Sequence, residues 1–204
     1  GRQITVTPDH PVYVLRGARF ERAAAEDLNV GDYLPVLKTS EFCERLTTEI
    51  DVAKTLSKAG HADAIRITDD QVRLRSGGRA GLPRMLPVSR ELAALLGYYL
   101  AVGQRAQSGR RYIVRLAFNK MGSDLATDAA ACIRAALGYE PEIRETTAGT
   151  EVAINSKLVY LLIDALGCGS TERDRSVPDL LFNRDYTLVG DYLGAAFRAG
   201  EEKT

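Results

Sequence analysis

The sequence predicts an α+β protein in two parts, a short all-β N-terminal segment and a larger domain of helices and strands. In the first forty residues, β-branched residues alternate with polar ones between prolines and glycines, which is typical of short strands and tight turns. After Pro87, apolar residues recur at helical spacing, and strand-like stretches lie between the helices without a strict strand–helix alternation. With 204 residues, 45% of them hydrophobic, the chain can bury one large core or two small ones.

The N-terminal segment, residues 1–38, is expected to contain several short strands. Residues 3–15, QITVTPDHPVYVL, predict two strands around a tight turn, because Pro8 and Pro11 cannot donate to a strand ladder. Turns are expected at residues 16–17 and 31–32, and a further strand over residues 33–37.

Residues 39–81 have a mixed character, and we treat them as a linker or an insert. A weak helical pattern covers residues 41–60, and two strands are expected on either side of Asp69 and Asp70. The glycine-rich stretch GGRAGLP over residues 77–83 reads as a linker.

The domain over residues 82–204 begins with the longest apolar helix. Ser89 is the expected N-cap of a helix over residues 90–102, and Glu91 lies in its first turn, where a negative charge suits the helix dipole. Alternation over residues 110–120 predicts a strand with Val114 and Leu116 on the same face. The remaining elements expected here are a helix over 122–138, a hairpin over 140–154, a helix over 155–167 and a helix over 188–200.

The charges balance overall but are unevenly distributed. Lysine plus arginine and aspartate plus glutamate number 27 each, so net charge alone indicates no nucleic-acid or membrane partner. Between residues 71 and 120, however, ten basic residues stand against one acid, Glu91. This asymmetry indicates either a polyanion-binding face or a solvated basic surface. The ten are Arg73, Arg75, Arg79, Arg84, Arg90, Arg105, Arg110, Arg111, Arg115 and Lys120.

The cysteines and the hydropathy of the sequence indicate which classes of protein can be excluded. Three cysteines without C-x-x-C spacing indicate neither a disulfide framework nor a structural zinc site. The longest apolar run, residues 92–102, is too short to cross a bilayer, and no signal-peptide pattern is seen. We therefore expect a cytoplasmic protein with no membrane partner, and both ends indicate a piece excised from a longer chain.

Two short motifs in the N-terminal segment resemble a known family. Thr7 and His10 form a T-x-x-H element in VTPDHPVYV, and LNVGDYLPV over residues 28–36 supplies an L-x-x-G-D-x-L element. In this order and spacing, the pair resembles the opening of the Hint fold, the protein-splicing domain of inteins. The resemblance covers residues 1–38.

The resemblance implies catalytic roles for Thr7 and His10. In inteins, the first step moves an acyl group from a backbone nitrogen to a Cys or Ser side chain, without a cofactor. His10 would protonate the leaving amide nitrogen, because its ordinary pKa lies near neutrality, and Thr7 would polarise the scissile peptide. Gly1 cannot supply the nucleophile, and the family's closing His-Asn pair would lie beyond Thr204, so this chain alone is not expected to splice. The partners implied are the host protein's exteins in the full precursor.

The second half of the chain resembles another family. LPVSRELAALLGYYLAVG over residues 86–103 is similar to the first motif of a LAGLIDADG homing endonuclease, a domain commonly inserted in inteins. The similarity continues through INSKLVYLLIDALGCG, RSVPDLL and YLGAAFRAGE, up to the family's second motif copy. It covers residues 82–202.

This resemblance implies a DNA-binding architecture with paired motif helices and DNA-facing sheets. Small residues would let the two helices approach closely, and each helix would end in a carboxylate that holds Mg²⁺ against the scissile phosphates of double-stranded DNA. A monomer is expected. The helix-pair residues implied are Gly97, Ala101, Gly194, Ala195 and Ala199. The basic residues expected to contact the duplex are Arg105, Arg110, Arg111, Arg115 and Lys120.

At the metal positions the chain departs from the pattern. Val102 stands where the first motif has its acid, and Gly200 occupies the corresponding place in the second copy. Glu201 or Glu202 could serve only after a shift of register. A valine at this position should abolish cleavage, so we expect no productive Mg²⁺ binding.

The leading hypothesis is therefore an intein fragment whose homing endonuclease domain binds DNA but does not cleave it. A second hypothesis is a DNA-binding regulator built on a catalytically inactive LAGLIDADG scaffold. A third is an active endonuclease that uses Glu201 or Glu202, against which Val102 argues.

Overall fold

The computed structural model describes residues 5–16, 19–35, 46–78, 80–171, 173–182 and 185–201. Within these residues the chain forms five α-helices and four small antiparallel sheets, none closed into a barrel, which confirms the α+β prediction. The chain divides into two compact units, Gly1–Glu41 and Phe42–Thr204. In the described residues, no helix is both long and apolar enough to span a membrane.

The N-terminal unit is built on one hairpin. Strand β1 (Pro11–Arg16) pairs antiparallel with β2 (Arg19–Ala24), and the short helix η1 (Ala25–Asp27) follows. Residues 5–7 form no strand, although two strands were expected within residues 3–15. The strand expected over 33–37 is reduced, in its described part, to a bridge between Leu15 and Tyr33. β2 was not predicted, because RFERAA is mostly polar and lacks a clear alternation.

The larger unit is organised around a four-stranded antiparallel sheet of order β10-β11-β9-β8. Its strands are β8 (Gly103–Ser108), β9 (Arg111–Asn119), β10 (Glu142–Glu145) and β11 (Gly149–Asn155). β9 and the hairpin that contains β10 and β11 were predicted. β8 was missed, because GQRAQS has no β-branched residue.

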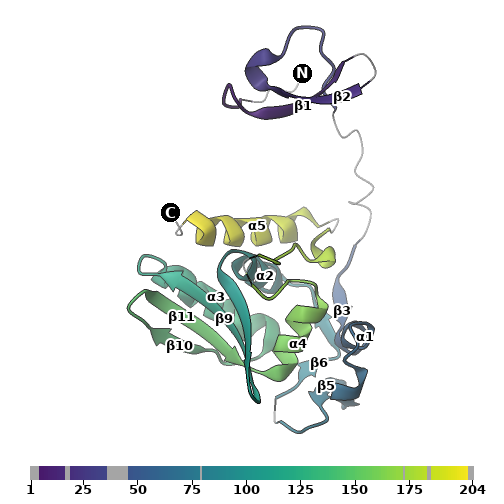
Figure 1. Cartoon of the computed structure of the whole chain (residues 1–204). Coiled ribbons are helices and arrows are strands. Elements are labelled where there is room, and N and C mark those ends of the chain that lie inside the picture. Colours follow the sequence, from purple (N-terminus) through teal and green to yellow (C-terminus); the bar gives the residue numbers. More distant parts are fainter. Residues whose placement is uncertain are drawn as a thin grey trace. The chain divides into compact units, whose positions relative to one another are not determined.

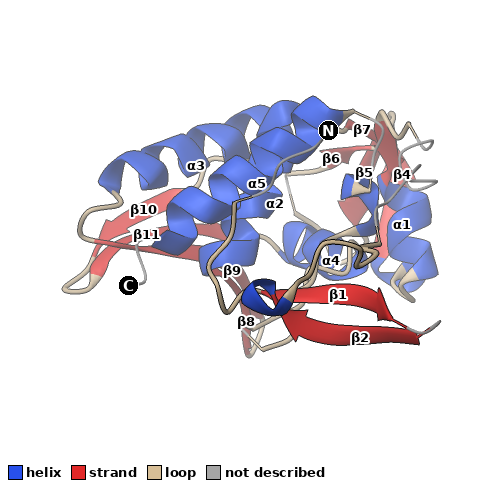
Figure 2. Cartoon of the chain, turned by 90° about the horizontal axis from the view of Figure 1, so that it is seen from above, coloured by secondary structure: helices blue, strands red, loops and turns tan. Residues whose placement is uncertain are grey.

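Helices cover one face of this sheet and leave the other open. α2 (Arg90–Val102), α3 (Ser123–Leu137) and α4 (Lys157–Ala165) pack on the sheet, and α5 (Tyr186–Glu201) packs on α2 (Figure 1). The view in Figure 2 shows the helices gathered over the sheet from above. The core between sheet and helices is apolar and includes Leu95, Tyr99, Val114, Leu116, Ile133, Val152 and Val159. The predicted caps are confirmed: the Ser89 hydroxyl accepts from Leu92 N at 3.2 Å, and Gly138 ends α3 in the left-handed conformation.

Residues 46–88 join this same core. They form β3 (Glu49–Asp51), α1 (Val52–Lys58), η3 (Ala62–Ala64), β4 (Ile65–Thr68), β5 (Gln71–Leu74), β6 (Leu82–Pro83) and β7 (Met85–Pro87). Asp69 and Asp70 make the expected turn, both with positive φ, and the helix expected over 41–60 is limited in its described part to α1. Ile50, Leu56 and Val72 are buried in one cluster with α2 and the sheet, so this segment packs as part of the larger unit. The proposed domain limits at residues 38 and 81 stay predictions.

Candidate nucleic-acid interface

The open face of the four-stranded sheet carries a groove. Along β9, the side chains of Val114, Leu116 and Phe118 are buried toward the helices, so the intervening residues lie on the open face, as the alternation predicted. A groove of about 500 Å³ runs over this face. It is lined by Arg110, Arg111, Tyr112, Ile113, Glu142, Arg144, Glu151, Ala153, Asn155 and Lys157.

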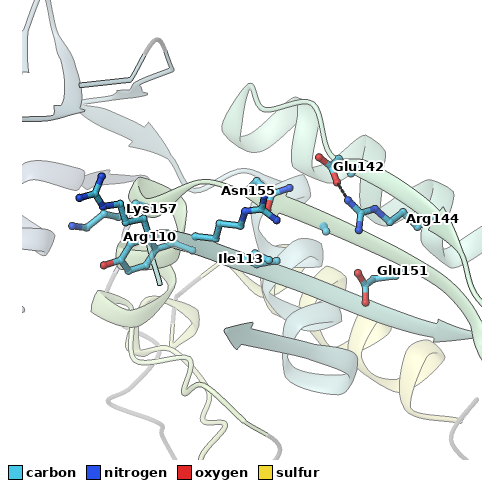
Figure 3. Close-up of a pocket in the computed structure, with 10 residues that line it drawn as sticks. Arg110, Ile113, Glu142, Arg144, Glu151, Asn155 and Lys157 are labelled. Atoms are coloured by element: carbon cyan, nitrogen blue, oxygen red, sulfur yellow. Dashed lines mark hydrogen bonds and ion pairs between the residues drawn. The ribbon is translucent and has the colours of Figure 1, made fainter. Parts of the chain in front are cut away.

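One end of the groove is basic. Arg110 and Arg111 lie at the turn between β8 and β9, and Lys157 is the first residue of α4. Figure 3 shows Arg110 and Lys157 close together at this end. The Lys157 ammonium lies 5.0 Å from the centre of the Tyr112 ring, a cation–π contact that holds it in place. In the described part of the chain, no carboxylate forms an ion pair with these three cations, so their charge is available to a ligand.

Acids balance the basic residues at the other end of the groove. Arg144 donates to Glu142 at 2.5 Å, and Figure 3 shows this pair with Glu151 away from Arg110. Glu151, which lines the groove, also lies 3.6 Å from Arg115, a residue of the open face outside the groove lining that donates to the Gln104 side-chain oxygen at 2.6 and 3.0 Å. The groove is therefore polarised, with free positive charge at one end and paired charges at the other.

Four of the five basic residues predicted to meet DNA are accessible, and the fifth is not. Arg110, Arg111 and Lys120 are exposed, and Arg115 is half-buried on the open face. Arg105 pairs across the ladder with Val114, which places it on the face covered by helices. Strand alternation could not reveal this orientation, because β8 itself was not predicted.

Arg105 is instead part of the structural core, with 8% of its surface exposed. Its guanidinium donates to Asp164 at 2.6 Å, to the Gly169 carbonyl at 3.1 Å and to the Tyr160 carbonyl at 3.3 Å, and it stacks on the Tyr160 ring. A buried arginine with its donors satisfied in this way has no surface to offer a phosphate. We therefore leave Arg105 out of the proposed interface.

The α2–α5 helix pair has the close contact that the motif resemblance implies. A Cβ added at Gly97 would lie 2.1 Å from the Tyr192 carbonyl oxygen and 3.1 Å from the Ala195 Cβ. Ala195 and Ala199 are fully buried, and Ala101 is partly buried against the same core. Small residues at these positions therefore let the two helix backbones touch.

Gly194 does not share this role. It is exposed, and a Cβ added there would meet no atom within 4 Å, so of the two neighbouring residues predicted for the helix pair, Ala195 faces α2 and Gly194 does not. Arg198 lies at a further position where the motif has an acid. It donates to the Tyr98 hydroxyl at 3.2 Å and lies 3.7 Å from Asp128, so it joins α5 to α2 and α3. At the start of the pair, Arg90 binds Asp191 at 2.7 Å.

At the C-terminal end of α2, where the motif would place its acid, the described residues present no carboxylate. Val102 is apolar and 7% exposed, and Gly200 offers no side chain. Arg175 donates to the carbonyls of Leu100 and Ala101, so a guanidinium rather than a cation-binding oxygen faces these groups. A positive charge at a helix C-terminus is electrostatically favourable. Magnesium takes carboxylate and carbonyl oxygens, and the described donors do not fit it.

The fallback acids give no further support to a metal site. The Glu201 side chain and all of Glu202 lie outside the described residues. In the residues that the structure describes, no group of three or more His, Cys, Asp or Glu side chains could hold a metal ion.

In the N-terminal unit, Thr7 and His10 are brought together by a turn. The His10 amide donates to the Thr7 carbonyl at 3.0 Å, and both side chains are exposed. Asp32, from the second motif, has a structural role: its carboxylate accepts from the Arg16 guanidinium at 2.6 and 3.1 Å and from Asn29 N at 3.0 Å. This hydrogen bonding by Arg16 lowers the pKa of Asp32 to about 2.

Sequence reasoning missed three residues of interest in the larger unit. Arg144 and Lys157 line the groove but lie outside the basic stretch over 71–120, and only their place on strand and helix ends brings them there. Arg175 stands in RSVPDLL, where the similarity covered it without assigning it a role. Its contact with α2 spans more than seventy residues, which no local pattern reveals.

Comparisons with known proteins give two distant relatives. The chain is 22% identical, over 97% of its length, to an uncharacterized protein of Methanocaldococcus jannaschii. It is 23% identical, also over 97% of its length, to the DNA polymerase II large subunit of Thermococcus kodakarensis. The chain spans 28% of the first protein and 13% of the second. No family model matches the chain.

Proposed function

We propose that the chain is part of an intein whose homing endonuclease-like domain binds double-stranded DNA without cleaving it. The distant similarity to a DNA polymerase large subunit is compatible with insertion in a DNA-processing host protein. The binding surface would be the open face of the β8–β11 sheet.

The observation that carries the DNA-binding proposal is the basic end of the groove. Three cations from two elements, Arg110, Arg111 and Lys157, converge there without ion pairs among the described residues. Convergent unpaired cations attract phosphates, and the release of the counterions of DNA contributes most of the affinity for such a surface. At the other end, the Arg144–Glu142 pair presents hydrogen-bonding groups of the kind that contact base edges.

The expected loss of cleavage follows from the end of α2. Val102 and Gly200 provide no carboxylate, and Arg175 faces the last carbonyls of the helix. The proposal therefore assigns no metal-dependent step to this domain.

For splicing, we propose that Thr7 and His10 assist the first acyl shift in the full precursor. The attacking Cys or Ser side chain gives up its S–H or O–H proton to solvent and forms the new acyl bond as the scissile C–N bond breaks, which frees the backbone nitrogen as an amine. His10 then supplies a proton to the departing amide nitrogen. Thr7 lies three residues away across a turn and is exposed with it, so both side chains can reach a peptide bond placed beside them.

A binding experiment tests the DNA-binding part. The affinity of the chain for a fluorescent duplex of mixed sequence, about 20 bp long, is measured by anisotropy over a range of salt concentrations. Arg111→Gln should lower the slope of log K against log salt by about 0.9, the value for one lost phosphate contact. Arg134→Gln is the matched control, because Arg134 is paired with Glu140 on the outer surface of α3. Equal slopes for both variants and the parent chain would contradict the proposed surface.

A nicking assay tests the absence of cleavage. The chain is incubated with the uninterrupted host gene on a supercoiled plasmid, in magnesium or manganese. We expect no nicked product. Cleavage that is lost in Glu201→Gln would show that the second motif has a different register.

A DNA-binding regulator is the second candidate, and one observation favours it. Residues 42–204 form a compact unit with its own core, so the DNA binding that we propose would not require the N-terminal segment. The flanking gene sequence separates the two candidates. An intein requires a Cys or Ser before the Thr7 element and a His-Asn pair after residue 204, whereas a regulator requires neither.

A further inference from the structure

A polar pair of side chains lies beside the groove on the open face of the four-stranded sheet. β8 is an edge strand, and because Arg105 is turned to the covered face, its neighbour Gln104 lies on the open face. The register pairs Gln104 directly with Arg115, and Arg115 with Ala153, which lines the groove. Neighbouring strands are about 4.8 Å apart, so Gln104 lies about 10 Å from Ala153 across the sheet.

Arg115 fixes which way round the Gln104 amide is held. Two of its nitrogens, Nε and Nη2, donate to Gln104 Oε1 at 3.0 and 2.6 Å. A guanidinium has only donors and an amide NH2 group cannot accept, so turning the amide over would set donors against donors. Arg115 is itself held, because its third nitrogen, Nη1, lies 3.6 Å from Glu151. The Gln104 oxygen therefore stays on Arg115, and only the NH2 group is left for a ligand.

This NH2 group is accessible. Gln104 is half-buried, and its Nε2 has no hydrogen-bond partner among the described residues. It is also not one of the described polar atoms that are buried without a partner, so it reaches solvent. The open face therefore carries an unpaired donor in a fixed orientation, next to the surface we propose for DNA.

A fixed donor distinguishes between the bases in the major groove. Guanine presents two acceptors there, N7 and O6, whereas cytosine presents only the N4 donor. The usual contact of glutamine with adenine needs both the amide oxygen and the NH2 group. In Gln104 the two donors of Arg115 occupy both lone pairs of that oxygen. Gln104 is thus left to favour guanine and to disfavour cytosine.

We propose that Gln104 is a specificity-determining residue that selects guanine in the major groove, and that Arg115 is the positioning residue that fixes its amide. The inference rests on the proposed function and deepens it from the binding of DNA to the choice of sequence. It also changes the role expected of Arg115, because Gln104 and Glu151 engage its guanidinium in place of a phosphate.

Selection from a pool of duplexes tests the proposal. The chain is mixed with duplexes randomised over about 20 bp, and the bound fraction is sequenced. For the parent chain we expect one position at which guanine is enriched over cytosine by about tenfold, within the range for one good base contact.

Three variants identify the residue that reads this position. Gln104→Glu keeps the bond to Arg115 but presents acceptors, so cytosine should replace guanine there. Arg115→Met releases the amide oxygen, so adenine should become the preferred base. Gln107→Glu is the matched control, because it makes the same change on β8 but on the other side of the strand, and should leave the preference unchanged.

The outcomes separate this inference from the proposed function. An unchanged preference in Gln104→Glu, or guanine still preferred in Arg115→Met, would overturn the inference. Gln104→Ala removes only the amide and should abolish the preference, so the test does not depend on the stability of Arg115→Met. If the parent chain binds the pool without any sequence preference, only this inference fails. If it binds no duplex, both proposals fail.

Discussion

Replacing Gly97 with alanine should destabilise the larger unit, because no space exists for the added methyl group. The new carbon would lie 2.1 Å from the Tyr192 carbonyl oxygen, whereas an ordinary carbon–oxygen contact is about 3.3 Å or more. The obstacle is backbone, so α2 and α5 would have to separate by roughly 1 Å. Overpacking of this kind costs about 1–3 kcal/mol, and the better helix propensity of alanine offsets about 1 kcal/mol of it.

Gly194→Ala is the matched control on the partner helix. It makes the same chemical change in α5, but its added carbon meets nothing within 4 Å, so only the propensity gain of up to about 1 kcal/mol remains. Thermal unfolding followed by near-ultraviolet circular dichroism reports on the buried tyrosines Tyr98, Tyr99 and Tyr192. For a domain of this size, each kcal/mol shifts the midpoint by about 2–4 °C. We expect the midpoint to fall for Gly97→Ala and to rise slightly for Gly194→Ala. Equal midpoints would refute the close helix contact.

Three further predictions concern other contacts. An NMR titration of the Asp32 carboxyl should give a pKa of about 2, below the unfolded value of about 3.9. The stabilisation from its bond to Arg16 is therefore present above pH 4 and is lost as pH falls toward 2. A measured pKa near 4 would contradict this pairing. Asp164→Ala should lower the free energy of unfolding, measured in urea, by about 1–2 kcal/mol, because it leaves the buried Arg105 guanidinium without its ion pair; an unchanged midpoint would show that the carbonyl contacts suffice. Burial raises the pKa of Cys132 to about 11 and that of Cys168 to about 12, so mass spectrometry should find both unmodified by iodoacetamide at pH 8 until urea unfolds the chain, and rapid labelling of the folded chain would count against their burial.

Much of the larger unit was predictable because its signals are local. Ser89, the apolar run after it and Gly138 each act within a few residues, through capping, burial or the left-handed conformation. β8 escaped prediction because its residues carry no strand preference, and pairing with β9 makes it a strand. In the N-terminal unit, β2 is likewise a strand through its partner β1 rather than through its composition.

In the candidate site, too, features set by local sequence were predictable, and features set by contacts between distant residues were not. The alternation of β9 correctly placed Arg115 on the face opposite Val114, since the period of a strand fixes the side. The same clustering of basic residues also included Arg105, whose side depends on the register of β8 and on Asp164, 59 residues away in the chain. A count of charges therefore locates a basic region, but the pairing of strands decides which of its members face a ligand.

On α2, the closest contact with α5 and the position where the motif would place its acid lie at different points along the helix. The closest backbone approach is at Gly97, and Val102 lies five residues later, about 7.5 Å further along the helix axis. A change from an acid to valine at position 102 therefore leaves the contact at Gly97 untouched. Near Val102, at the C-terminal end of α2, the Arg175 guanidinium donates to the carbonyls of Leu100 and Ala101. A metal site built from carboxylates would not require this contact. The groove cations Arg110, Arg111 and Lys157 come from elements other than this helix end. It follows that the residue at position 102 can change without disturbing the helix contact at Gly97 or the surface we propose for DNA.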